Sequence, residues 1–153
     1  MLKSLRYLNV AVQLADKRIL LSRKHIDGDR FTQWAITIER FLGETQEALS
    51  ELNKVAWEVF GIDAQTYSDS FLEFRRIHPI YHTNVFMIPF IMKFKSSLAF
   101  QVKKEMQFAA IPLDKLLVDI MENSAFPKNG GPSKHTCNAI YMAKEIQLRG
   151  LFN

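Results

Sequence analysis

Cysteine is almost absent from this chain of 153 residues, since Cys137 is the only one. One cysteine cannot form a disulfide within the chain, and small secreted domains usually carry several, so a reducing compartment is favoured. The most apolar run, Val85 to Met92, is far shorter than the roughly 20 residues that a membrane helix needs. The apolar N-terminal stretch is broken by Asn9 and Gln13, which argues against a signal peptide. We therefore expect a cytoplasmic protein with no membrane partner.

Charge of one sign is not strongly dominant, because the formal net charge is only +4 and charged residues make up 24% of the chain. A positive charge attracts anions such as nucleotides or RNA. The chain has no dense Lys/Arg patch and no recognised RNA-binding motif, so a nucleic-acid partner stays open but solubility alone explains the charge better. The length and the 48% hydrophobic content suit a single domain over residues 1–153.

Two periodic patterns predict strands near the N-terminus. Apolar and polar residues alternate from Leu8 to Leu14, which is typical of a strand. Residues 18–24 follow a turn at Asp16-Lys17 and are predicted to return as the second strand of a hairpin. Residues 25–32 are predicted as a loop, and a third strand follows around residues 34–38.

The next segment changes to a helical period. Thr45 is predicted to cap a helix that runs to about Phe60 and is stopped by Gly61. Its apolar residues would make one buried face. They are Ala48, Leu49, Leu52, Val55, Ala56 and Val59.

The second half of the chain is predicted to form shorter elements. Strands are expected at residues 74–80, 85–94 and 106–111, and Pro89 favours an edge position or a bulge for the second of them. One helix is expected from Pro112 to about Glu122, and Ser133 is predicted to cap a last helix. Hairpin-like strands with interspersed helices predict an α/β fold in which a mixed sheet is packed between helices.

Several short motifs follow one another in a distinctive order. They are RILLSRK at residues 18–24, Trp34 before Ala-Ile-Thr, GETQEA at residues 43–48, Gly61-Ile62, and IPLDKL at residues 111–116. In that order they resemble motifs of the Nudix hydrolase superfamily. The resemblance implies a Nudix-like α/β/α sandwich with a mixed β-sheet between helices. It also implies a metal-dependent pyrophosphohydrolase that acts on a nucleoside diphosphate-linked compound, with Mg²⁺ or Mn²⁺ as cofactor.

The catalytic signature of that family is degenerate in this chain. When the pattern is aligned on Gly61-Ile62, Lys54-Val55 stands at its Arg-Glu pair and Glu58-Val59 at its Glu-Glu pair, so only Glu58 is retained. Thr37-Ile38-Glu39 stands where Pro-Gly-Gly is expected. The departure leaves two hypotheses open. The chain is either a divergent hydrolase with a shifted site or a pseudoenzyme that binds a nucleotide, RNA or a protein partner without turnover.

Four acidic residues carry the hydrolase hypothesis. Mg²⁺ prefers oxygen ligands and bridges phosphates, so clustered carboxylates are required. The resemblance to the Nudix family makes the candidate metal ligands Glu47, Glu51, Glu58 and Glu105, of which Glu51 and Glu58 are the candidate catalytic residues. At 100° a residue, Glu47, Glu51 and Glu58 share one helix stripe, although Glu58 lies about 10 Å further along the axis than Glu51. The alternative is an ordinary solvated helix face.

Three further residues are candidates for substrate binding. Arg23 and Lys24 end a strand at the place where the resemblance expects substrate phosphate, and a guanidinium suits phosphate because it donates two parallel hydrogen bonds. Trp34 either stacks on a nucleobase or packs in the core. The expected partner is therefore a nucleotide-type small molecule, and the sequence leaves homo-oligomer formation open.

Overall fold

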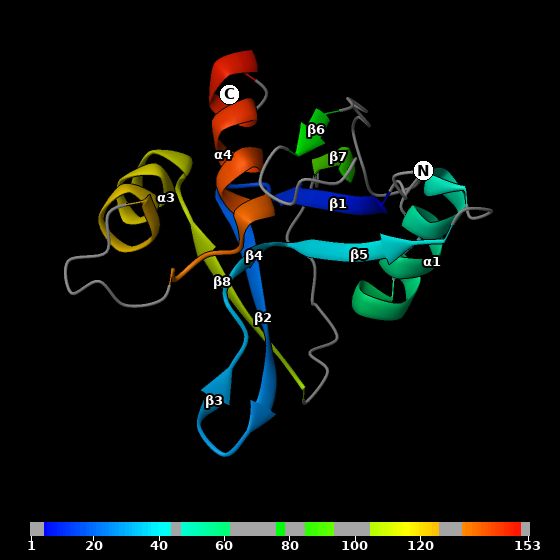
Figure 1. Ribbon diagram of the computed structural model, residues 1–153, viewed down its shortest axis with the longest axis horizontal. Helices are drawn as coiled ribbons and strands as arrows, with labels where there is room; N and C mark the ends of the chain where they lie inside the picture. Colours follow the sequence, from blue (N-terminus) through cyan, green and yellow to red (C-terminus); the bar gives the residue numbers. More distant parts are fainter. Residues whose placement is uncertain are drawn as a thin grey trace.

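A mixed β-sheet lies between helix α1 on one face and helices α3 and α4 on the other in the computed structural model (Figure 1). The structure describes residues 5–43, 47–61, 76–78, 85–93, 105–125 and 133–150. The strands are β1 (Leu5–Gln13), β2 (Ile19–Asp27), β3 (Arg30–Phe31), β4 (Ala35–Ile36), β5 (Ile38–Leu42), β6 (Arg76–His78), β7 (Val85–Lys93) and β8 (Met106–Ile111). The helices are α1 (Ala48–Phe60), α3 (Leu113–Ile120), the π-helical turn η2 (Met121–Ala125) and α4 (Cys137–Arg149). The predicted α/β class is confirmed.

Strand β1 is the centre of the sheet. It runs parallel to β7 from Leu5↔Val85 to Gln13↔Lys93, and antiparallel to β5 along its other edge. The predicted hairpin forms, but β1 and β2 are paired only at Gln13↔Ile19 because the two strands then diverge to other partners. Strand β2 pairs instead with β8, β4 and β3, all antiparallel.

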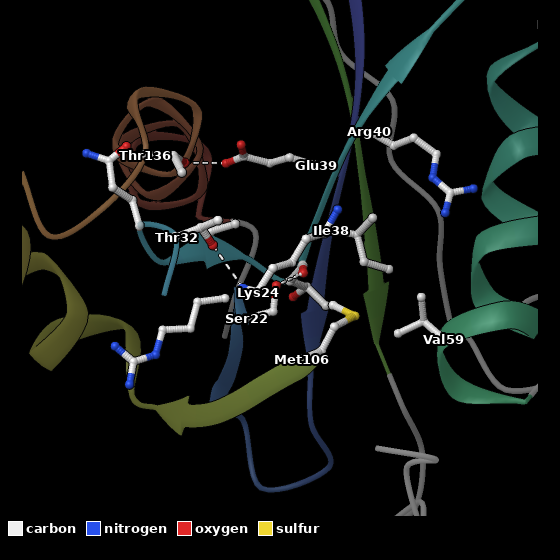
Figure 2. Close-up of a pocket in the computed structure, with 13 residues that line it drawn as sticks. Ser22, Lys24, Thr32, Ile38, Glu39, Arg40, Val59, Met106 and Thr136 are labelled. Carbon is white, nitrogen blue, oxygen red and sulfur yellow. Dashed lines mark hydrogen bonds between the residues drawn. The ribbon is translucent and has the colours of Figure 1, made fainter. Parts of the chain in front are cut away.

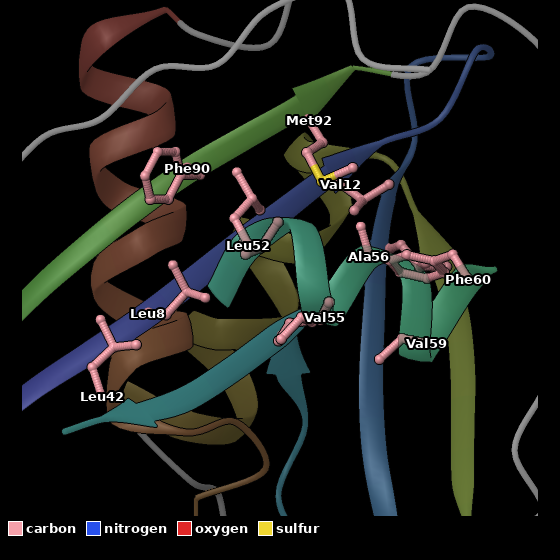
Figure 3. Close-up of a cluster of buried hydrophobic side chains, with 13 residues drawn as sticks. Leu8, Val12, Leu42, Leu52, Val55, Ala56, Val59, Phe60, Phe90 and Met92 are labelled. Atoms are coloured by element: carbon pink, nitrogen blue, oxygen red, sulfur yellow. The ribbon is translucent and has the colours of Figure 1, made fainter. Parts of the chain in front are cut away.

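The two faces of the sheet bury two separate cores, because alternate residues of a strand point to opposite sides. On β1, Leu8 and Val12 face α1, whereas Ala11 faces α3 and α4. Figure 3 shows the α1 side, where Leu52 and Phe60 of the helix lie over the strands. The alternation that was visible in the sequence thus decides which helix each strand residue contacts.

Helix α1 ends as predicted but begins later. Gly61 closes it with a left-handed φ of 66°, a conformation that glycine adopts without steric cost. The residue at the N-cap position is Glu47, whose side chain makes no capping hydrogen bond. Thr45, the predicted cap, lies outside the described residues, as does Glu44. No helix in the described ranges is both long and apolar enough to span a membrane.

Three sequence predictions are wrong in detail. The predicted loop at residues 25–32 is mostly strand, since β2 continues to Asp27 and returns as β3 around Gly28. Strand β7 is not at an edge, because it lies between β1 and β6. The pairing with β6 covers only the first residues of β7 and stops before Pro89. Thr136, not Ser133, caps α4 by accepting a hydrogen bond from the Ala139 N–H at 3.0 Å. Ser133 instead donates to the carbonyl of His135 at 2.8 Å.

Candidate functional site

A cavity of about 220 Å³ opens beside the middle of β2 (Figure 2). Strands β2, β5 and β8 form its walls, together with the N-termini of β4 and α4 and the end of α1. Its lining residues are Ser22, Arg23, Lys24, Thr32, Gln33, Ala35, Thr37, Ile38, Glu39, Arg40, Val59, Met106 and Thr136. Two of the three predicted substrate-binding residues, Arg23 and Lys24, therefore lie at one cavity.

Thr37 sets the direction of the strand that borders this cavity. It separates β4 from β5 and has a φ of 46°, which is unusual for a β-branched residue. Four hydrogen bonds hold it there. Its N–H and its hydroxyl both donate to the Leu20 carbonyl, its hydroxyl accepts from the Val12 N–H, and its carbonyl accepts from the Ser22 hydroxyl. The kink places the next residues, Glu39 and Arg40, in the cavity wall.

Arg23 is held between two aromatic rings. Its guanidinium carbon lies 4.1 Å from the centre of the Phe31 ring and 4.6 Å from that of Trp34. Its Nε donates to Gln107 Oε1 at 2.7 Å. Trp34 is itself half-buried and packs against the core under α3 and α4. These contacts orient the guanidinium and leave both terminal Nη groups without an acceptor in the described part of the chain.

The predicted acidic residues do not gather around one point. Arg40 of β5 reaches α1 instead, with Nη2 3.2 Å from Glu58 Oε2 and Nη1 3.7 Å from Glu51 Oε2. Glu47 is exposed at the start of α1, and Glu105 is exposed before β8, where its carbonyl accepts from the His25 N–H. Within the ranges described above, no three His, Cys, Asp or Glu side chains are placed to hold a metal ion. The described residues therefore do not form a site for a divalent cation.

Glu39 is the second charged residue that the kink brings to the cavity. Its carboxylate accepts a hydrogen bond from the Thr136 hydroxyl, which joins β5 to the first turn of α4. The residue is partly exposed as a whole, but its carboxyl group is enclosed. Burial raises the pKa of Glu39 from 4.5 to about 7, although the hydrogen bond from Thr136 opposes the shift. The acid therefore carries a proton for much of the time near neutral pH.

A polar cluster outside the cavity holds the segment that carries Thr136. The buried His135 has Nδ1 2.7 Å from the Ser124 hydroxyl and Nε2 3.3 Å from Asp119 Oδ2. Lys134 pairs with the same Asp119 at 2.8 Å. Burial lowers the pKa of His135, which favours its neutral form, although the carboxylate of Asp119 opposes the shift. This cluster fixes η2 to the chain just before α4.

Sequence reasoning did not select Glu39, Arg40 or Thr136. The replacement of Pro-Gly-Gly by Thr37-Ile38-Glu39 was a signal that this corner of the fold is unusual, but it did not indicate which side chain would be buried. The bond between Glu39 and Thr136 joins residues 97 positions apart. Arg40 is 11 residues from Glu51 and 18 from Glu58 along the chain, on a different element. No local pattern brings these partners together.

Known structures share this architecture. The Deinococcus radiodurans protein DR0079 matches with a TM-score of 0.66 at 11% identity, covering 92% of this chain and 82% of its own. A Nudix hydrolase from Nitrosomonas europaea matches with a TM-score of 0.56 at 13% identity, covering 97% and 90%. The Nudix domain of Shewanella oneidensis NrtR, complexed with ADP ribose, matches with a TM-score of 0.59 at 9% identity, covering 97% and 90%.

Sequence comparison adds nothing to these likenesses. No protein-family model and no curated protein sequence matches this chain. TM-scores of 0.56–0.66 establish a shared fold, and identities of 9–13% do not carry an activity from one protein to another. The resemblance noticed in the sequence and the architecture nevertheless agree, and the chain has the fold of the Nudix hydrolases.

Proposed function

We propose that this protein binds the phosphates of a nucleoside diphosphate-linked compound in the cavity beside β2, without metal-dependent hydrolysis. The observation that carries the proposal is the guanidinium of Arg23, which is oriented by Phe31, Trp34 and Gln107 and has both Nη groups available. A planar fork held in one orientation suits two parallel hydrogen bonds to phosphate oxygens. Because its orientation is already set, little side-chain entropy is lost on binding.

Most of the remaining cavity suits an anionic ligand, and the one acid in its lining, Glu39, is protonated for much of the time because its pKa is raised to about 7. Lys24 adds a second positive charge beside Arg23 on β2, and its ammonium group pairs with no acid in the described residues. The hydroxyl-bearing residues Thr32 and Thr136 also line the wall. A volume of about 220 Å³ is below the roughly 300–1,000 Å³ of sites that enclose a whole drug-sized molecule. The cavity therefore suits the phosphates, with the remainder of the ligand lying outside it.

Titration calorimetry with ADP ribose and with ADP, in the presence of EDTA, tests the proposal. ADP ribose is chosen because one of the structurally similar domains was determined with it. We expect binding by the wild type and a loss of about tenfold to a hundredfold for Arg23→Gln, since a hydrogen bond to a charged group contributes about 1.5–3 kcal/mol. Arg18→Gln is the matched control, because Arg18 is an exposed arginine paired with Asp16 and does not line the cavity.

Absence of binding by the wild type, or equal losses for Arg23→Gln and Arg18→Gln, would reject this proposal. A short single-stranded RNA is measured beside the two nucleotides. Tighter binding of the RNA than of both nucleotides would assign the cavity to a nucleic acid instead.

A second function, pyrophosphate hydrolysis with Mg²⁺ or Mn²⁺, is favoured by one observation. Glu51 and Glu58 lie close enough together to reach a single guanidinium, so the same two carboxylates would be the catalytic pair if Arg40 moved away. A turnover screen of nucleotide sugars, dinucleoside polyphosphates, nucleoside triphosphates and capped RNA with either metal separates the two functions. Turnover that disappears in Glu51→Gln would support hydrolysis and replace our first proposal.

A further inference from the structure

Two carboxylates of α1, those of Glu51 and Glu58, pair with one arginine of the neighbouring strand β5. Glu51 and Glu58 are seven residues apart, which is about 10.5 Å along a helix axis. Arg40 bridges that separation because β5 runs alongside α1 and the guanidinium presents several donors in one plane. Figure 2 shows the Arg40 side chain pointing from β5 toward α1, at the edge of the cavity.

The three side chains of this ion-pair network differ in their exposure to solvent. The Glu51 side chain is 12% exposed, whereas those of Arg40 and Glu58 are each 36% exposed. Removing one partner would leave Glu51 as an enclosed charge without this counter-ion, which is more costly than losing a surface pair. Arg40 therefore stabilises the enclosed charge of Glu51 as well as lining the cavity.

A divalent ion would have to compete with Arg40 for the same carboxylates. Mg²⁺ needs oxygen ligands at 2.0–2.1 Å in near-octahedral geometry. Two carboxylates seven residues apart reach that distance only if the guanidinium leaves them, and the positive charge of Arg40 would remain close by and repel the ion. Both the coordination and the electrostatics therefore disfavour a metal while Arg40 is present.

We propose that the Arg40 guanidinium is the built-in cation of this site and takes the place of a divalent metal. Arg23 and Lys24 then supply the positive charge for a phosphate ligand, while Arg40 balances Glu51 and Glu58 and makes the site select against metal ions. This inference concerns the same cavity as the proposed function, and it rests on that proposed function. Its test uses the metal alone, so the two can fail separately.

The experiment measures Mn²⁺ binding without nucleotide, by electron paramagnetic resonance and titration calorimetry. Variants are Arg40→Gln, which removes the charge, and Arg40→Lys, which keeps it. We expect Arg40→Gln to bind Mn²⁺ at least tenfold more tightly than the wild type, because Glu51 and Glu58 then lack this counter-ion. Arg40→Lys should bind as weakly as the wild type.

The double variant Arg40→Gln/Glu58→Gln shows whether the new site uses these carboxylates, and it should return to wild-type binding. The inference is overturned if the wild type binds Mn²⁺ as tightly as Arg40→Gln, or if the folded Arg40→Gln protein gains no binding. Should Arg40→Gln fail to fold, the wild type and Glu58→Gln decide. The inference requires the same weak Mn²⁺ binding for both, and tighter binding by the wild type overturns it. Failure of ADP ribose to bind, with these metal results intact, would reject only the proposed function.

Discussion

Thr37 is expected to be the most sensitive position around the cavity, although it contacts no ligand in our proposal. It is fully buried and has a positive φ, which costs an L-residue roughly 1–2 kcal/mol. Its hydroxyl accepts from the Val12 N–H at 2.9 Å and donates to the Leu20 carbonyl at 2.6 Å. We infer that these two bonds outweigh the backbone strain and tie β1 to β2 where the two strands diverge.

The substitution Thr37→Val keeps the shape and replaces the hydroxyl with a methyl group. The buried Val12 N–H loses its acceptor, which costs about 1–3 kcal/mol. The Leu20 carbonyl keeps the Thr37 N–H at 2.9 Å, so the second lost bond costs only about 1 kcal/mol. We therefore expect the free energy of unfolding to fall by about 2–4 kcal/mol. At about 2–4 °C for each kcal/mol in a chain of this size, the melting temperature should drop by about 5–15 °C.

Urea unfolding followed by circular dichroism measures the change. Thr37→Ser is the matched control, because it keeps the hydroxyl and loses one methyl group, and it should cost less than Thr37→Val by at least about 1 kcal/mol. A Thr37→Val protein within about 0.5 kcal/mol of the wild type would refute the reasoning. Equal destabilisation by both variants would show that packing of the methyl group, and not the hydroxyl, holds this corner.

Two further predictions concern the wall between β5 and α4. The folded protein binds the Glu39 proton more tightly than the unfolded chain does, since its pKa is raised from 4.5 to about 7. Its contribution to stability is therefore complete below pH 4.5 and is lost as the pH rises through 7, by about 3 kcal/mol at about 1.4 kcal/mol for each pH unit. The difference in urea stability between wild type and Glu39→Gln should follow that course, and a difference independent of pH would contradict it. Thr136→Ala should cost about 1–3 kcal/mol, because it loses both the cap of α4 and the hydrogen bond to the enclosed Glu39 carboxyl, and Ser133→Ala clearly less. A larger loss for Ser133→Ala in the same urea assay would restore Ser133 as the functional cap.

Much of the fold could be predicted because it depends on neighbours within a few residues. The alternation at Leu8 and Val12 predicted a strand, and the spacing from Leu52 to Phe60 predicted the buried face of α1. Gly61 was correctly assigned as the end of that helix. The cap of α4 was misplaced because Ser133 and Thr136 are both suitable capping residues. Only the pairing of Trp34 with His135, which keeps the chain extended up to Thr136, decides between them.

The site was predicted less completely. The sequence placed Arg23 and Lys24 at a strand end, which is wrong because β2 runs on to Asp27, but both residues line the cavity. It also placed Glu51 and Glu58 on one helix stripe, but it did not show that an arginine from another element would pair with both. Whether these residues bind phosphate or a metal stays a prediction for the experiments above.

The sequence by itself determined the periods, and therefore which side chains of each strand and helix face the interior. Those periods follow from the backbone geometry of a single element, which every residue within it shares. Only the tertiary structure decided that Arg40 meets Glu51 and Glu58, and that Glu39 meets Thr136. These contacts depend on how separate elements pack and on the kink at Thr37, which hydrogen bonds from β1 and β2 hold in place. No single stretch of sequence therefore contains them.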